Sequence, residues 1–239
     1  MNMNVNNTQL TVFGKFDSLE ATPEIVTRLF VLFKEDSFLP SFTQAFQVNP
    51  QTNDIKSIKM PLMNGQQNDN CIISFLPERM DIKISGKISQ LCKYCNYFRN
   101  VLSDFSIRPT RLAINTNRTI VDVKSDEIEA IGKKLIHGEA FPYKSFFEWG
   151  IRRVSREACS EEITELINIC ENIQLIQPLS PTPQAPPAIV VDTDINTLVG
   201  NVSNALVDKT ELVFEGMKKH DDKLEAALKT ALEGIKDDC

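Results

Sequence analysis

Ala188-Ile189-Val190-Val191 decides how the chain folds, because it lies between a proline-rich segment and a long helical pattern. Ile and Val are β-branched, and β-branched residues are enriched in β-strands. A free tail would have no reason to carry three of them in a row. We therefore predict a strand over residues 188–194 that returns to the main sheet.

The segment before this strand, residues 178–187, contains five prolines. Proline fixes φ and has no N–H group to donate, so such a segment favours extended polyproline geometry over sheet. We interpret it as a connector between the body of the protein and the returning strand.

After the strand, apolar residues recur at steps of three and four, which predicts an amphipathic helix over residues 195–239. We expect its first half to pack on the sheet. From about Met217 we expect an exposed apolar stripe that binds a protein partner or a second copy of the chain. The predicted partner-binding residues are Met217, Leu224, Leu228, Ala231, Leu232 and Ile235. A solvent-facing terminal helix that frays is the alternative.

The body, residues 1–177, shows short alternating apolar patterns that are typical of strands. Asn49-Pro50 and Asn64-Gly65 separate several of these patterns, and both dipeptides favour chain reversals. Helical spacing is found after Thr22-Pro23-Glu24, a typical helix start, and again over residues 88–105. These patterns predict an α+β fold, mainly antiparallel sheet with packed helices, and no internal repeat is evident.

The composition is that of a folded protein that is not inserted in a membrane. The 239 residues are 42% hydrophobic and 24% charged, and no window is long and apolar enough to span a bilayer. The polar N-terminus lacks the features of a signal peptide, so we predict a cytoplasmic protein. The net charge of −6 argues against nucleic acid as a partner. We predict no cofactor and no metal.

Three short segments resemble a sporadically distributed family of uncharacterised bacterial proteins. They are Phe75-Leu76-Pro77-Glu78-Arg79-Met80-Asp81-Ile82, Arg111-Leu112-Ala113-Ile114-Asn115 and Ile189-Val190-Val191-Asp192-Thr193-Asp194. The resemblance covers most of residues 10–219, although Ile114 stands where the family usually carries an aromatic residue. It implies an α+β fold without an established activity. Genes of this family often lie near phage-defence genes, so the resemblance also implies a role in bacterial anti-phage defence.

Arginines concentrate in one part of the chain and suggest an anion-binding site. Five basic residues against one acidic residue occur between positions 93 and 118. If their side chains share a face, they could hold a nucleotide phosphate or an acidic partner. The candidate residues are Arg99, Arg108, Arg111 and Arg118. The alternative is a set of ordinary surface arginines paired with nearby carboxylates.

Other motifs favour structural roles. Cys92-Lys93-Tyr94-Cys95 has the spacing of a metal or redox motif, but both cysteines lie on the apolar stripe of a predicted helix. There are two histidines, and His220 lies in the charged part of the last helix, so a histidine-based triad or zinc site would rest on His137 alone, in a predicted loop. Asp192 and Asp194 could bind a cation, but before a predicted helix we expect them to act as caps.

No catalytic motif emerges, so we expect a non-enzymatic interaction or accessory protein that binds a partner or self-assembles through its C-terminal helix. The alternative is a sensor or enzyme for an anionic small molecule such as a nucleotide, with a concave site lined by Arg99, Arg108 or Arg111.

Overall fold

The computed structural model describes residues 2–34, 37–48, 54–65, 71–135, 149–176, 187–198 and 206–236. The strands in these ranges are β1 (Asn2–Gly14), β2 (Phe38–Val48), β3 (Ile55–Gly65), β4 (Ile72–Leu76), β5 (Arg79–Ser85), β6 (Pro109–Val121), β7 (Gly150–Ala158), β8 (Leu166–Ile176) and β9 (Ala188–Thr197). The helices are α1 (Pro23–Phe33), α2 (Leu91–Asp104), α3 (Ser125–Leu135) and α4 (Leu206–Lys236), with a short 3-10 helix η1 (Asp17–Leu19).

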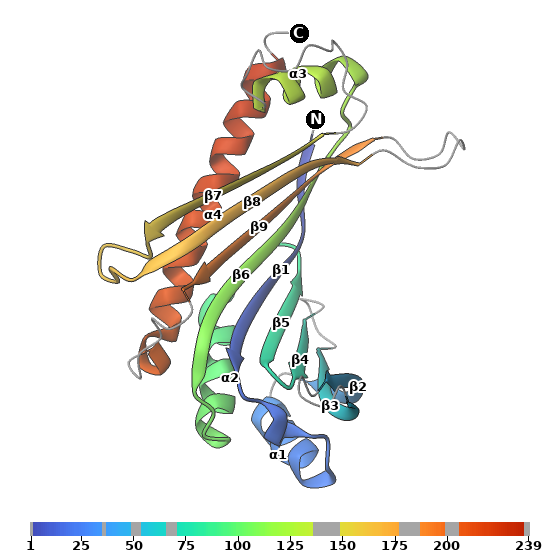
Figure 1. Cartoon of the computed structure of the whole chain (residues 1–239), viewed down its shortest axis with the longest axis vertical. Helices are drawn as coiled ribbons and strands as arrows, with labels where there is room; N and C mark the ends of the chain where they lie inside the picture. The colour runs from blue at the N-terminus through green and yellow to red at the C-terminus, as the bar shows by residue number, and fades with distance from the viewer. Residues whose placement is uncertain are drawn as a thin grey trace, which may run out of the picture.

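The nine strands of the described residues form one antiparallel sheet in the order β2-β3-β4-β5-β1-β6-β9-β8-β7 (Figure 1). This arrangement, with packed helices and a long C-terminal helix, confirms the predicted α+β fold. The predicted returning strand is β9, which lies between β6 and β8. Its β-branched residues Ile189 and Val191 are fully buried.

The two halves of the fold repeat one order of elements, although the sequence shows no internal repeat. Each half begins with a long strand (β1 or β6), continues with a helix and antiparallel strands, and ends with a second helix. In each half the last strand returns to pair with the first, so β5 pairs with β1 and β9 with β6. β1 and β6 then pair with each other and join the halves at the centre of the sheet.

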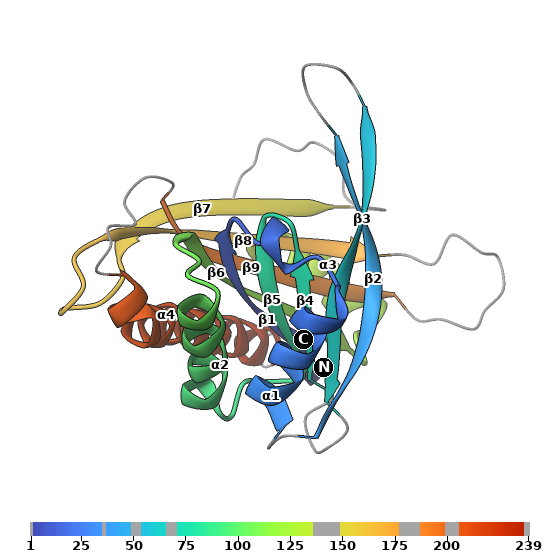
Figure 2. The same cartoon turned by 90° about the horizontal axis from the view of Figure 1, so that it is seen from below.

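Helices α1, α2 and α4 lie on one face of the sheet (Figure 2). Successive side chains of a strand point to opposite faces of the sheet, and most of those that point toward these helices are apolar. Leu10 in β1, Ile82 in β5 and Ile114 in β6 are examples from one cross-strand row, and all are at most 2% exposed.

No helix in the described ranges is long and apolar enough to cross a membrane.

The start of α1 follows the predicted local chemistry. Ile25 donates its backbone N–H to Thr22 Oγ1 at 3.3 Å, and Pro23 occupies the first turn. The hydroxyl therefore satisfies one of the N–H groups that a helix start leaves without an intrahelical partner.

Two predictions around β9 were wrong. Ile195 to Thr197 extend the strand, whereas we expected the helix to begin at residue 195. Asp192 and Asp194 therefore lie within β9 and do not cap a helix; Asp192 Oδ1 instead accepts a hydrogen bond from Asn117 Nδ2 at 2.6 Å. The connector lies outside the described residues, apart from its last residue.

The apolar stripe of α4 is buried, which corrects the expectation that it is exposed. Met217, Leu228, Leu232 and Ile235 are 0–8% exposed. Met217 belongs to a core cluster that includes residues of α2, β1 and β6, and Leu224 packs against the same cluster. The other three pack with residues of β6, α3, β8 and β9. Only Ala231 and Leu224 are partly exposed, so the stripe serves the fold itself.

Candidate functional sites

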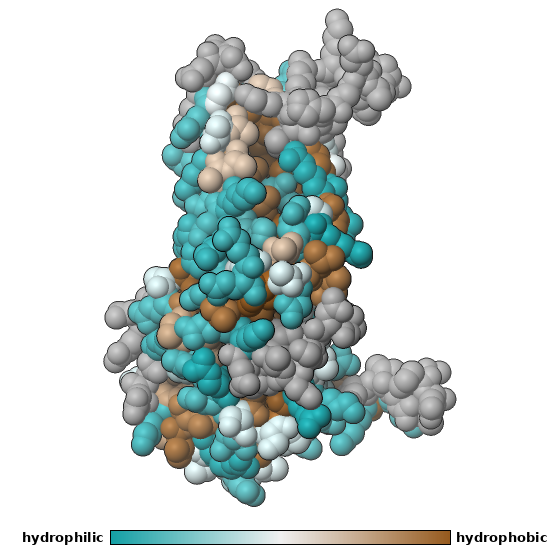
Figure 3. Space-filling model, turned by 90° about the vertical axis from the view of Figure 1, so that its left-hand side faces the viewer, coloured by the Kyte–Doolittle hydropathy of each residue, from teal (hydrophilic) through white to brown (hydrophobic). Residues whose placement is uncertain are grey.

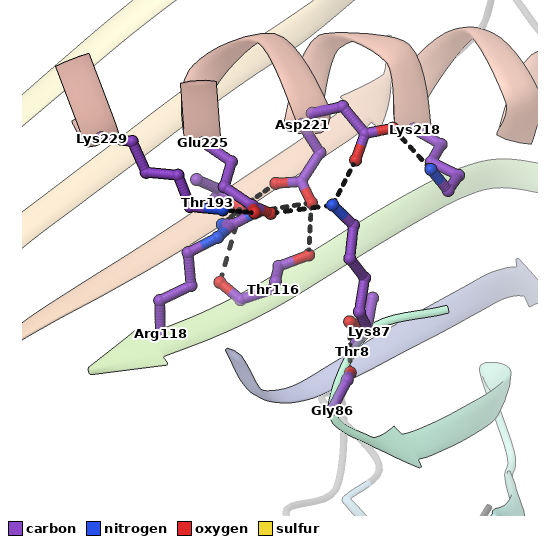
Figure 4. A network of polar contacts seen from close by, with 11 residues as sticks. Thr8, Gly86, Lys87, Thr116, Arg118, Thr193, Lys218, Asp221, Glu225 and Lys229 are labelled. Atoms are coloured by element: carbon purple, nitrogen blue, oxygen red, sulfur yellow. Dashed lines mark hydrogen bonds and ion pairs between the residues drawn. The ribbon is translucent and has the colours of Figure 1, made fainter. Parts of the chain in front are cut away.

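A buried network of polar side chains joins α4 to the sheet (Figure 4). Arg118 in β6 is fully buried, and its Nη2 lies 2.6 Å from Asp221 Oδ2 and 3.7 Å from Glu225 Oε2. Thr193 donates a hydrogen bond to Asp221 Oδ1 at 2.8 Å, and Thr116 donates one to Oδ2 at 3.0 Å. Both oxygens of the buried Asp221 carboxylate are therefore satisfied.

Lysines surround the acidic groups at the border of this network. Lys87 Nζ lies 3.0 Å from Asp222 Oδ1 and 3.1 Å from Glu225 Oε2, and Lys229 Nζ lies 2.7 Å from Glu225 Oε1. Burial alone would raise the pKa of Glu225, but the hydrogen bonds from Lys229 and Lys87 outweigh it and lower the pKa. Glu225 therefore stays ionised beside Arg118.

The network belongs to a polar row that crosses the helix-covered face of the sheet. Strand register aligns Thr8 in β1, Thr116 in β6, Thr193 in β9, Glu171 in β8 and Arg153 in β7. All but Arg153 are at most 5% exposed. Buried polar groups require partners. Asp221 of α4 accepts hydrogen bonds from Thr116 and Thr193, whereas Thr8 donates to the backbone oxygen of Gly86 and Glu171 lies against Arg153. The hydrogen bonds from this row to Asp221 thus fix the position of α4 along the sheet.

Glu171 is the least well compensated member of the row. It is 5% exposed, and its Oε2 lies 3.7 Å from Arg153 Nη1. Burial raises the pKa of Glu171, and Arg153 and Arg118 lower it to a smaller extent. The ionised carboxylate therefore costs the folded state free energy.

Replacing Glu171 by Gln is expected to raise the thermal midpoint at pH 7.5, because the amide carries no charge into the buried site. A raised pKa means that the folded protein takes up this proton before the unfolded chain does, so wild type gains stability as pH falls toward the ordinary range of Glu. The gap between the two proteins should therefore shrink at pH 5. Glu157→Gln, at an exposed position of β7, should have no effect at either pH. An equal loss of stability in Glu171→Gln at both pH values would contradict this expectation.

The four candidate arginines do not form one site. Arg118 is buried in the network, and Arg99 in α2 binds Glu211 of α4 at 3.2 Å. Arg108 is exposed just before β6. Arg111 lies on the opposite face of the sheet from Arg118, with its guanidinium carbon 5.0 Å from the centre of the Phe13 ring. A shared anion site for all four is therefore excluded by their positions.

An open cavity of about 500 Å³ lies beside Phe13 on the face away from the helices. Phe46 and Leu76 line it together with Arg79. Arg79 Nε already lies 2.9 Å from Asp81 Oδ2, which offsets its charge. Apolar side chains form most of its lining, and the charged residues there are Glu78 and Arg79, of which Arg79 is paired with Asp81.

A second cavity of about 490 Å³ lies between α4 and the loop that joins β7 to β8. Cys159 and His220 line it, and His220 Nε2 lies 3.0 Å from the backbone oxygen of Ala158. Burial raises the pKa of the Cys159 thiol to about 11, so this cysteine is a poor nucleophile. Gly216 allows the close approach here, because a Cβ at this position would lie 2.6 Å from the Cys159 backbone oxygen.

The remaining sequence motifs fall in α2 or outside the described ranges. Cys95 is buried and its pKa is raised by burial to about 12, whereas Cys92 is exposed. In the part of the chain that the structure describes, no group of three or more His, Cys, Asp or Glu could hold a metal ion. His137 lies outside that part.

The β2–β3 hairpin carries the most exposed apolar side chains among the described residues. We call this hairpin the arm, because it extends away from the rest of the sheet (Figure 2). Phe42 is 51% exposed, Phe46 67% and Ile55 68%. All three lie on one face of the arm, since Phe42 and Phe46 are four residues apart and Phe46 pairs with Ser57, two residues from Ile55. The opposite face packs inward through Ala45, Ile58 and Met60.

The two edges of the sheet differ in charge. All eleven residues of β2 are uncharged, and Pro40 near its start is its one residue without a backbone N–H. β7, at the other edge, carries Arg152, Arg153, Arg156 and Glu157. Charged side chains are a common protection of edge strands against further pairing. Charged side chains therefore protect β7 against pairing with a further strand, whereas β2 has no charged side chain and is open to one.

Sequence reasoning identified the strand at Phe42 and Phe46 but missed that the two rings are exposed. An uncharged strand with aromatic residues at every fourth position was the available signal, and it is equally typical of a buried strand. The side of the molecule that carries α4, by contrast, is mainly hydrophilic, with separate apolar patches (Figure 3).

No family model matches the chain, and no curated protein matches it. The resemblance to the bacterial family therefore stays a prediction.

Proposed function

We propose that the protein is a non-enzymatic interaction protein that binds an added polypeptide strand along the open edge of β2. The observation that carries the proposal is the uncharged edge strand with Phe42, Phe46 and Ile55 exposed on one face of the arm. An edge strand offers unpaired N–H and C=O groups, and partners bind such edges by adding a strand while side-chain contacts provide specificity.

This proposal keeps the predicted class of function and changes the surface. Docking through α4 required an exposed stripe from Met217 onward, and the stripe is buried against α2, α3 and the sheet. The arm instead exposes large apolar groups that the fold does not use. Exposed apolar groups that gather on one surface are typical of interaction sites.

The test is affinity capture from a bacterial lysate with tagged protein. Phe42→Lys/Phe46→Lys should lose the proteins that wild type retains, because two charges on the edge oppose strand addition and remove the apolar contact. Val154→Lys/Leu166→Lys is the matched control, since both positions are exposed (53% and 44%) and lie near the other edge. Retention of the same proteins by all three would refute the proposal.

The alternative of a sensor or enzyme for an anionic small molecule has less support. Its arginines lie apart, and the cavity near Phe13 contains Arg79 already paired with Asp81. A cytoplasmic location and a role in anti-phage defence are further parts of the proposal, and they rest on the sequence.

A further inference from the structure

We propose that the strand added to β2 is the β2 strand of a second copy of this chain, so that the protein is a two-fold symmetric dimer. The inference rests on the proposed function, because it names the occupant of the same edge. Antiparallel pairing of two identical strands is self-complementary, since every contact occurs twice around the symmetry axis. β2 already pairs in this orientation with β3.

The positions of the two phenylalanines select one register. With the axis at Gln44, Phe42 of one copy lies opposite Phe46 of the other, and the reverse pair forms across the axis. Cross-strand partners share a face of the sheet, so both ring pairs lie on the exposed face of the arm. A shift by one residue would place Phe42 of one copy opposite Ala45 of the other. The exposed face of one arm would then be joined to the inward-packed face of the other arm.

Charge does not oppose this pairing, although each copy carries a net charge of −6. The nearest cation on the exposed face is Lys59 in β3, whose Nζ lies 5.3 Å from the centre of the Phe42 ring. In the dimer the two Lys59 side chains would be three strand spacings apart, about 14 Å. This distance exceeds the Debye length of about 8 Å at physiological ionic strength, so their repulsion is screened.

The charged opposite edge explains why assembly would stop at two copies. A sheet with two open edges could add copies without end, whereas β7 presents three arginines and a glutamate. Pro40 has no backbone N–H to donate, so the hydrogen bonds between the two β2 strands are limited to the residues of β2 that follow it. Pairing across β2 therefore closes the assembly at a dimer.

The native mass is the first test. Wild type should sediment as a species of twice the 27.0 kDa chain mass at micromolar concentration, and Phe42→Lys/Phe46→Lys should sediment as a single chain. The Val154→Lys/Leu166→Lys control should remain a dimer. Far-UV circular dichroism spectra of equal shape in the three proteins would show that the lysines on the arm leave the fold intact; the thermal midpoint does not serve here, because loss of the dimer lowers it by itself.

Cross-linking tests the register. In a Cys92→Ser/Cys239→Ser background, Gln44→Cys should form a disulfide-linked dimer under mild oxidation, because residues opposite each other on the axis have Cα atoms about 4.5–5.5 Å apart. Ser41→Cys is the matched control, because Ser41 lies in the same strand and belongs to neither ring pair. Its two copies would be offset by six residues, about 20 Å along the strand, which is too far for a disulfide.

The outcomes separate this inference from the proposed function. A dimeric wild type, a monomeric arm variant and cross-linking at Gln44 alone support it. A single-chain mass at every concentration overturns it, while continued loss of captured proteins in the arm variant would leave the proposed function standing. If that capture is also unaffected, both proposals fail. A dimer that survives the arm substitutions, or one that cross-links equally at Ser41, also overturns the proposed interface.

Discussion

Arg118→Met is expected to destabilise the fold by about 3–5 kcal/mol, because it leaves the buried carboxylate of Asp221 without its cation. Asp221 is 6% exposed and Arg118 is fully buried, so water replaces little of the lost interaction. Met is unbranched and apolar, which keeps much of the packing volume of the arginine stem. The free energy of unfolding from urea titration, followed by circular dichroism, measures the effect.

The double variant Arg118→Met/Asp221→Leu separates the ion pair from packing. Replacing both charges by apolar groups of similar size is often neutral for a buried pair, so we expect most of the lost stability to return. If the double variant is as unstable as Arg118→Met, the loss comes from packing, and the network does not position α4 as we describe.

Phe214→Ala is the second substitution with a large expected effect, a loss of about 3–5 kcal/mol from removing a fully buried aromatic ring. Phe214 in α4 is stacked on Phe98 in α2, with ring centres 5.6 Å apart, and both are 0% exposed. The cavity would open between the two helices where they meet above the sheet. Urea titration again provides the free energy of unfolding.

Leu212→Ala is the matched control for Phe214→Ala. Leu212 lies two residues earlier in α4 and is 42% exposed, so its truncation should change stability by less than about 0.5 kcal/mol. Equal small effects at both positions would mean that α4 does not close the core. The helix would then be an appendage, which its helical spacing alone would allow.

The fold class was predictable because alternation, turn dipeptides and helix caps are local signals. The returning strand was predictable for the same reason, since a run of β-branched residues after a proline segment is best explained by a strand. The burial of the α4 stripe was not. Helical spacing shows that Leu228 and Leu232 share a face, but not what covers it. The cover comes from α3, β6 and β9, which are distant in the sequence.

The candidate site shows the same limit. Arg111 and Arg118 are seven residues apart in one strand, and an odd separation puts two side chains on opposite faces of a sheet. Strand parity alone therefore divides the arginine cluster between two faces. The partners of Arg118 could not be foreseen, because Asp221 lies 103 residues later in the chain.

This separation has a consequence for synthesis of the chain. The ribosome adds about 5–20 residues per second, so Asp221 is synthesised roughly 5–20 s after Arg118. During that time β6 has β1 beside it, while β9 and α4 do not yet exist. The N-terminal half, from β1 to α2, is complete before β6 begins. The arm is thus available for pairing between neighbouring nascent chains well before the final helix secures the second half.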